Sequence, residues 1–111
     1  FQWHEHTFSL PPGAVALARS ACAEQQAFAI GSMLAMQFHL EMTPESISGL
    51  VARYPGDLEQ VSDCVQSAEA ITADLADRAR RLYRIAAVVF GRWVAMIKDK
   101  KAICCAARSI G

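Results

Sequence analysis

Short apolar runs alternate with polar residues in the first 41 positions of the chain, and turn-forming residues separate the runs. A period of two with such punctuation is typical of β-strands, because successive side chains of a strand point to opposite faces. The pattern predicts strands at 1–4, 15–19, 27–30 and 34–38. Gly31 and Ser32 favour a hairpin turn between the last two strands, and the Leu-Pro-Pro-Gly sequence at 10–13 predicts an earlier turn.

The hydrophobic period changes to that of a helix after residue 42. Thr43 is a typical N-cap, Pro44 suits the first helical position, and Glu45 places a negative charge in the first turn, where the helix dipole favours it. The Pro-Gly pair at 55–56 predicts the end of this helix. The sequence therefore predicts a strand region over about 1–41 and a helical region from 43 to about 98.

A second, longer helix is predicted from about residue 67 to residue 98, and Asp77 marks a candidate break in it. Its apolar stripe consists of Ile71, Leu75, Leu82, Ile85, Val89, Trp93 and Met96. Three arginines lie off this stripe and are expected to be exposed to solvent: Arg81, Arg84 and Arg92. Residues 99–111 have no clear period, so we expect a loose tail there.

Strands followed by helices, without a complete parallel βαβ layer, are the order expected for the C-terminal half of an α/β domain. The 111 residues, 53% of them hydrophobic, suffice for one compact domain with a core and are too few for two. Alone, the predicted strands would have unpaired edges, which are unfavourable. We therefore expect this sequence to be part of a longer protein that continues on the N-terminal side.

Charge is distributed unevenly, although the net charge is zero. Residues 1–77 carry a balance of −8 and residues 78–111 a balance of +8. A basic outer face of the C-terminal helix explains this more simply than a nucleic-acid or membrane contact does. We expect no nucleic-acid partner and no membrane span, because the sequence has no phosphate-binding glycine loop, no aromatic–basic interleaving and no apolar stretch of about 20 residues.

The four cysteines, at positions 22, 64, 104 and 105, follow no zinc-binding spacing and include no Cys-x-x-Cys pair. We also expect no signal peptide. Reduced thiols in a cytoplasmic protein are then the simplest expectation.

His39 and Glu41 are the strongest candidates for chemistry. They alternate with Phe38 and Leu40 near the end of a predicted strand, so their side chains are expected on one face. A carboxylate beside an imidazole fixes its tautomer and stabilises its protonated form, and the imidazole can then act as a general base. A His-x-Glu sequence by itself is common in proteins, so the surrounding residues must indicate whether this one is catalytic.

The segment 37–41, Gln-Phe-His-Leu-Glu, resembles the Gln-Phe-His-Pro-Glu motif of class I glutamine amidotransferases, with Leu40 at the proline position. Residues 1–14 look like the strand and Leu-Pro-Pro-Gly turn of the subgroup similar to the amidotransferase part of GMP synthase. Residues 26–28 resemble the Ala-Phe strand that follows. The resemblance implies the C-terminal half of a flavodoxin-like, three-layer α/β domain over residues 1–111, with strands first and helices last.

The resemblance also implies hydrolysis of the side-chain amide of glutamine, or of a γ-glutamyl compound, through a Cys-His-Glu triad without a cofactor. His39 would be the general base and acid, and Glu41 would orient it. The segment with His4, Glu5 and His6 would contact the substrate, although Glu5-His6 replaces the Gly-Asp pair usual in the subgroup. The resemblance allows a synthetase domain or subunit that accepts the ammonia, and a homo-oligomer.

The nucleophilic cysteine is the missing part. The family places it between glycines at a strand-to-helix turn, and none of the four cysteines has such neighbours. Two alternatives stay open beside the enzyme: a diverged or truncated interaction module without hydrolysis, and a metal site. The metal ligands would be His4, His6, His39 and Glu41.

Overall fold

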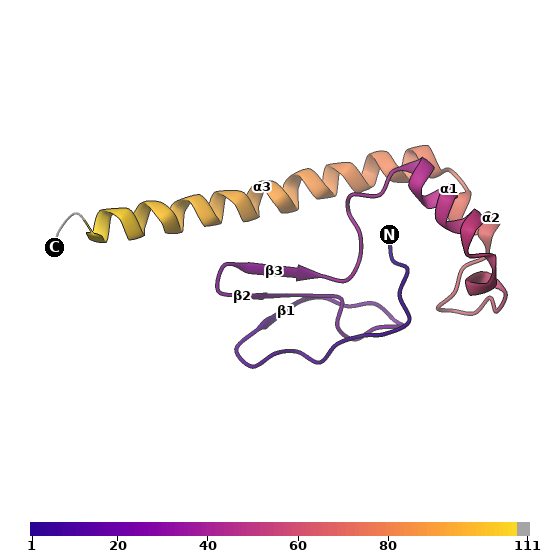
Figure 1. Cartoon of the computed structure of the whole chain (residues 1–111), viewed down its shortest axis with the longest axis horizontal. Helices are drawn as coiled ribbons and strands as arrows, with labels where there is room; N and C mark the ends of the chain where they lie inside the picture. Colours follow the sequence, from indigo (N-terminus) through magenta and orange to yellow (C-terminus); the bar gives the residue numbers. More distant parts are fainter. Residues whose placement is uncertain (109–111) are drawn as a thin grey trace.

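The chain folds into three short strands followed by helices (Figure 1). The computed structural model describes residues 1–108, with side-chain surroundings through residue 99. The elements are β1 (Val15–Ala18), β2 (Ala27–Ile30), β3 (Met33–Met36), α1 (Pro44–Arg53), the 3-10 helix η1 (Pro55–Leu58), α2 (Ala68–Thr72) and α3 (Leu75–Arg108). The mixed α/β order, strands before helices, is the order that the sequence predicted.

The three strands form one antiparallel sheet in the order β1-β2-β3. Ile30 pairs with Met33, so only Gly31 and Ser32 connect β2 to β3. Gly31 has a φ of 61°, which suits the first central residue of a type II′ hairpin turn and which glycine adopts without a steric penalty. The predicted hairpin is confirmed.

The predicted turn at 10–13 is also present. Ala14 N donates to Pro11 O at 3.0 Å across Pro12 and Gly13. Gly13 has a φ of 78°, as the third residue of a type II turn requires. The turn leads the chain into β1, whose side chains are mostly exposed at one edge of the sheet.

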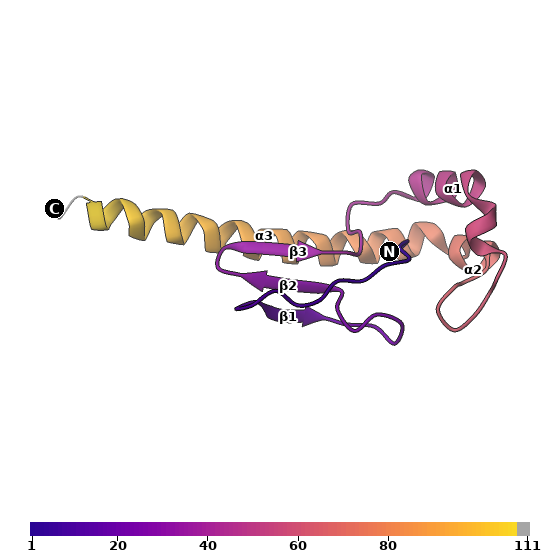
Figure 2. The same ribbon diagram turned by 60° about the horizontal axis from the view of Figure 1, so that its bottom comes forward.

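The first eight residues form no strand, which corrects the strand predicted at 1–4. Phe1 exchanges two backbone hydrogen bonds with His39, of 3.1 and 2.7 Å, but no further backbone pair among the described residues extends this contact into a ladder. The segment instead runs over the sheet (Figure 2). There the ring centroids of Phe8 and Phe28 lie 5.3 Å apart in an edge-to-face contact. Packing on the sheet therefore holds this segment.

The first helix, α1, begins and ends as the sequence predicts. Thr43 and Ser46 form a capping box: Thr43 Oγ1 accepts from Ser46 N at 3.1 Å, and Ser46 Oγ accepts from Thr43 N at 2.8 Å. Pro44 occupies the first turn, and the Pro-Gly pair at 55–56 begins η1 after α1 ends. Ile47, only 4% exposed, anchors the inner side of the helix.

A sharp break separates α2 from α3 at Asp74, slightly before the candidate break at Asp77. Asp74 has a φ of 49°, a left-handed conformation that interrupts a helix. Nη1 of Arg78 then donates at 2.7, 3.2 and 3.3 Å to three carbonyl oxygens at the end of α2, those of Ala70, Ile71 and Ala73. These bonds satisfy carbonyl groups that the helix end leaves unpaired, and they hold α2 against the first turn of α3.

The last helix, α3, continues to Arg108. The loose tail expected at 99–111 is therefore wrong for residues 99–108, and residues 109–111 lie outside the described part of the chain. α3 runs alongside β3 in both views (Figures 1 and 2), and Trp93 Nε1 donates to Ser32 O at 3.0 Å. No helix in the described residues is long and apolar enough to cross a membrane.

The inner side of α3 differs in part from the predicted stripe. Ile85 and Met96, expected inside, are 54% and 36% exposed. The least exposed positions of α3 are Leu75, Ala79, Leu82, Ala86, Val89, Trp93 and Ile97. Two alanines on this line permit a close approach of the helix, which a stripe read from large side chains alone does not reveal. The arginines at 81, 84 and 92 are exposed, as predicted.

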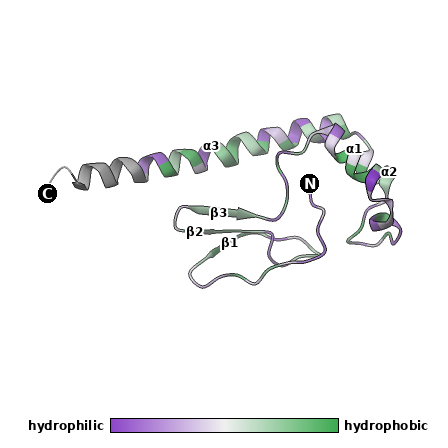
Figure 3. Cartoon of the chain, in the orientation of Figure 1, coloured by the Kyte–Doolittle hydropathy of each residue, from purple (hydrophilic) through white to green (hydrophobic). Residues whose placement is uncertain are grey.

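The core is small and the chain is extended, which corrects the expectation of one compact domain. The radius of gyration is 18.0 Å, whereas a compact chain of this length would have about 13 Å. The buried hydrophobic residues are Ala23, Ala27, Leu40, Ile47, Ile71 and Ala79. Larger apolar side chains of β1 and α3 are exposed instead, and Figure 3 shows apolar residues spread along α3.

Cys22 and Cys64 form a disulfide, which corrects the expectation of four reduced thiols. Their Cα atoms are 5.6 Å apart, within the range that a disulfide requires, although 42 positions separate them in the sequence. Spacing alone could not reveal the bond, because the fold brings the loop after β1 to the loop before α2. The cytoplasmic location inferred from reduced thiols loses part of its basis and stays a prediction.

We predict that Ile47→Ala lowers the free energy of unfolding by about 2–4 kcal/mol, because it leaves a cavity in a small core. Urea unfolding followed by circular dichroism measures the change. Val61→Ala is the matched control: Val61 is 62% exposed, so its truncation should cost less than about 0.5 kcal/mol. Equal effects of the two substitutions would contradict the anchoring role of Ile47.

Candidate active site

The segment that connects β3 to α1 carries His39 and Glu41. β3 ends at Met36, so both residues lie beyond the strand. The sequence had suggested that they lie at the end of the strand itself. The alternation of side chains nevertheless persists: Leu40 is 4% exposed, whereas the side chains of His39 and Glu41 are 44% and 64% exposed. The buried leucine anchors the segment and leaves its two polar neighbours at the surface.

His39 and Glu41, called the candidate pair below, contact one another directly. Nδ1 of His39 lies 2.6 Å from Oε1 of Glu41, so the side chains are within hydrogen-bond reach as the sequence predicted. When the carboxylate accepts from Nδ1–H, the ring is held in the tautomer whose Nε2 has a free lone pair. In this arrangement an imidazole can take a proton from a nucleophile.

The backbone of His39 is held by the first residue of the chain. Phe1 N donates to His39 O at 3.1 Å, and His39 N donates to Phe1 O at 2.7 Å. Two residues that exchange both backbone bonds form a close antiparallel pair. The position of the imidazole therefore depends on the N-terminal segment as well as on β3.

The pKa of Glu41 is lowered below its ordinary value. The largest cause is a hydrogen bond from its own backbone N–H, and the bond to the His39 side chain comes next. Both favour the charged carboxylate, because a hydrogen-bond donor stabilises the ionised form. At neutral pH, Glu41 is therefore the anion that a hydrogen bond from Nδ1–H requires.

The predicted substrate segment consists of His4, Glu5 and His6. Nδ1 of His4 donates to His6 O at 2.9 Å, and Nε2 of Gln37 donates to the same oxygen at 2.5 Å. Gln37 precedes His39 by two positions, so one side chain ties the segment to the strand that leads into the candidate pair. No hydrogen bond among the described residues joins the segment directly to the pair.

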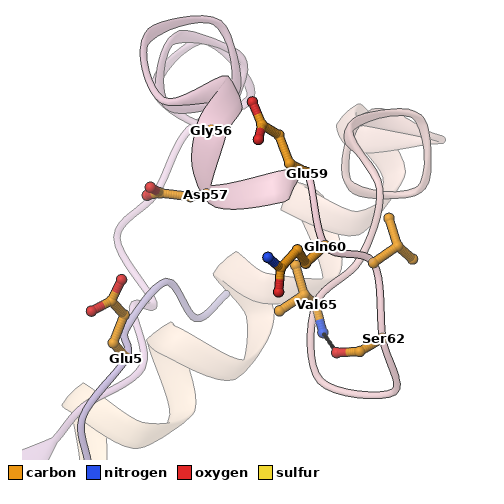
Figure 4. A pocket seen from close by; sticks show the side chains of 8 residues that line it. Glu5, Gly56, Asp57, Glu59, Gln60, Ser62 and Val65 are labelled. Atoms are coloured by element: carbon orange, nitrogen blue, oxygen red, sulfur yellow. Dashed lines mark hydrogen bonds between the residues drawn. The ribbon is translucent and has the colours of Figure 1, made fainter.

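Glu5 reaches a shallow, open depression on the side of η1 and the loop that follows it (Figure 4). Asp57 and Glu59 add two further carboxylates, so the depression is acidic. Trp3 Nε1 donates to Asp57 Oδ2 at 2.8 Å, which ties η1 to the N-terminal segment. The candidate pair does not line this depression.

Three glutamines, whose role was not predicted from the sequence, join the N-terminal segment to the sheet. Gln26 is 3% exposed, and its Nε2 donates to Gln2 Oε1 at 2.5 Å and to Ser20 Oγ at 3.2 Å. Gln37 N donates to Gln26 O at 2.9 Å, next to the β2–β3 ladder. Extending the predicted hairpin by one pair would have placed Gln26 and Gln37 opposite each other.

The structure offers neither a free cysteine thiol nor a metal site among its described side chains. Cys22 and Cys64 are bonded to each other, so neither is a thiolate in this state. Cys104 and Cys105 belong to α3, and their side chains lie outside the described ones. No three His, Cys, Asp or Glu side chains come together around a metal position within the described residues, so the metal site considered from the sequence is not assembled there.

A pH dependence follows from Glu41. Its pKa is lower in the folded chain than the ordinary value of 4.5 expected when unfolded, so the carboxylate stabilises the fold above that value, and the contribution disappears as the pH falls through the folded pKa. Glu41→Gln should therefore lower the free energy of unfolding at neutral pH by at most about 1 kcal/mol, as for exposed pairs. Below the folded pKa it should change nothing.

Urea unfolding of both proteins at neutral pH and in acid measures this difference. Glu24→Gln is the control, because Glu24 is exposed and its carboxylate has no hydrogen bond among the described residues. An effect of Glu41→Gln that persists unchanged in acid would show that the charge of Glu41 is not its source.

Comparison with known proteins gives a match to most of this chain. Neither the protein-family models nor the curated proteins gave a match. Among solved structures, a glutamine amidotransferase from Methylobacillus flagellatus is 34% identical, with a TM-score of 0.78, over 86% of this chain and 41% of that chain. The chain thus spans about two fifths of the length of that protein. Over the matched residues, the chain is similar to that glutamine amidotransferase in sequence and in fold.

Proposed function

We propose that this chain carries the histidine and the glutamate of a Cys-His-Glu triad that hydrolyses the side-chain amide of glutamine or of a γ-glutamyl compound. The observation that carries the proposal is the 2.6 Å contact between Nδ1 of His39 and Oε1 of Glu41. The 34% identity to a glutamine amidotransferase supports it. In this proposal the chain is a class I member, of the subgroup similar to the amidotransferase part of GMP synthase.

The proposed reaction needs a cysteine from outside these 111 residues. Nε2 of His39 takes the proton of that thiol, and the thiolate attacks the amide carbon of the substrate. His39 then passes the proton to the departing ammonia, and it next activates a water molecule that releases glutamate from the thioester. Glu41 holds the ring and stabilises its protonated form between these steps. The reaction uses no cofactor.

The segment of His4, Glu5 and His6 would contact the substrate. Its support is the bond from Gln37 to His6 O, because Gln37 precedes His39 by only two positions. Because Glu5 and His6 are exposed, their side chains remain available to a ligand. The ammonia would pass to a synthetase domain or subunit.

The rest of a flavodoxin-like, three-layer domain would cover the apolar surface that this half leaves open. Val15 and Leu17 of β1 are 63% and 53% exposed, and Ile85 and Val88 of α3 are 54% and 53% exposed. Such side chains are more typical of a covered surface than of a solvated one. The coverage of 41% of the related amidotransferase supports the same proposal.

A second candidate is a member that keeps this fold without hydrolysis and acts as an interaction module. It is favoured by the bonded state of Cys22 and Cys64, which leaves no free cysteine thiol among the described side chains. The two candidates differ in one observable, the presence of a Gly-x-Cys-x-Gly turn in the complete open reading frame.

The main proposal is tested by glutamate release from glutamine, measured on the full-length protein. His39→Ala should lower kcat by about 10²–10⁴-fold, because the general base and acid is lost. Circular dichroism checks that the variant is folded. Glu69→Gln, at an exposed position of α2, is the control and should leave activity unchanged.

Full activity of the His39→Ala variant would overturn the assignment of the base. A full-length protein with no Gly-x-Cys-x-Gly turn and no glutamate release would instead favour the interaction module.

A further inference from the structure

We propose that the Cys22–Cys64 disulfide is a redox-responsive clamp, which a dithiol reductant can open in the folded protein and which holds the loop of residues 59–66 in place. The bond joins the loop after β1 to the loop between η1 and α2. Its presence and effect on the loop do not depend on the proposed hydrolysis. Its consequence for substrate binding does rest on the proposed function.

The disulfide is accessible from solvent. Both Cys22 and Cys64 are exposed, and so are their neighbours Ala21 and Asp63. Thiol–disulfide exchange requires that a thiolate reach one of the two sulfur atoms. Exposed disulfides are more often labile or regulatory than buried structural ones. Reduction of this bond therefore requires no unfolding.

Little besides the disulfide holds the loop. Among the described residues, the hydrogen bonds within 59–66 are local: Ser62 N donates to Val65 O at 3.0 Å, and Val65 N donates to Ser62 O at 3.3 Å. Asp63 O of the loop also lies 3.7 Å from Cys22 Sγ, but this contact with the segment after β1 involves the same cysteine. Nearly every residue of the loop is exposed, so it buries almost no apolar surface.

The two ends of the loop are fixed independently. Trp3 holds η1 through Asp57, and Arg78 holds α2, the helix that follows the loop, through three carbonyl oxygens at its C-terminal end. Breaking the disulfide therefore releases the middle of the loop and leaves the flanking elements in place. A segment with few buried contacts and anchored ends is the kind that opens locally without global unfolding.

The clamped loop forms one wall of the acidic depression. Ser62 and Val65 lie on one side of it, and Glu5 of the predicted substrate segment lies on another (Figure 4). Val61 of the same loop also lines the depression. In the oxidised state, the disulfide fixes the wall of the depression that lies across from Glu5. In the reduced state this wall is free to move, and under the proposed function the surroundings of the substrate segment change with it.

The chemical step is an exchange with a dithiol. One thiolate of the reductant attacks a sulfur of the Cys22–Cys64 bond, which breaks and leaves a mixed disulfide and one cysteine thiolate. The second thiol of the reductant displaces the other cysteine and closes an oxidised ring. Two electrons pass from the reductant to the protein disulfide, and the two cysteines end as thiols after proton uptake.

The test combines thiol mapping with hydrogen exchange on the folded chain. Protein oxidised with glutathione disulfide is incubated with or without dithiothreitol, in the absence of denaturant, and then alkylated. Trypsin cuts after Arg19, Arg53 and Arg78, so Cys22 and Cys64 are read in separate peptides, apart from Cys104 and Cys105. Alkylation of Cys22 and Cys64 only after dithiothreitol is the expected result.

Amide exchange over residues 59–66 should then become about tenfold faster, while exchange over α1 stays unchanged. The variant Cys22→Ser should show the faster exchange without reductant and no response to dithiothreitol. If that variant fails to fold, reduced wild-type protein provides the same comparison.

Three outcomes would overturn the proposal. The first is alkylation of both cysteines in oxidised protein without reductant, which would mean that no bond forms. The second is reduction only in denaturant, and the third is reduction with unchanged exchange over 59–66. None of these outcomes depends on glutaminase activity, so failure of the clamp and failure of the proposed hydrolysis are distinguishable.

Discussion

The pairing of β2 with β3 fixes the geometry on which the candidate pair depends. The two-residue turn sets the register, and the bond from Gln37 N to Gln26 O extends it by one pair beyond the strands. A slip of one residue would turn the candidate pair inward and Leu40 outward, because strand side chains alternate between faces. The N-terminal segment then pairs with His39, so its position also follows from that register.

Local chemistry made part of this structure predictable from the sequence. Gly31 and Gly13 adopt positive φ values where the turns need them, and Thr43 caps a helix that Pro44 begins. The contact between His39 and Glu41 was predictable for the same reason, because two residues of an extended segment share a face whatever surrounds them. The strand itself ends earlier, since its last pair with β2 involves Met36.

Contacts between distant segments could not be predicted in this way. The disulfide joins residues 42 positions apart, and the bond from Gln37 to His6 joins residues 31 apart. Alanines on the inner side of α3 permit a close approach of this helix. A stripe predicted from large apolar side chains alone leaves these alanines out. The segment at 1–4 has the composition of a strand, but among the described residues it makes one backbone pair, between Phe1 and His39. The chain packs on the sheet further along, through Phe8.

Leu40 stands where the Gln-Phe-His-Pro-Glu motif, which this segment resembles, has proline. This difference changes what holds the two side chains of the candidate pair in contact. Proline stiffens a backbone locally, whether or not the surrounding protein is folded. Leucine has no such effect, and here the segment is fixed by burial of its side chain, 4% exposed. The alignment of imidazole and carboxylate is thus a property of the packed interior and not of the motif alone. Heat that unfolds the small core therefore also separates the imidazole from the carboxylate, so the pair is lost at the temperature at which the fold is lost.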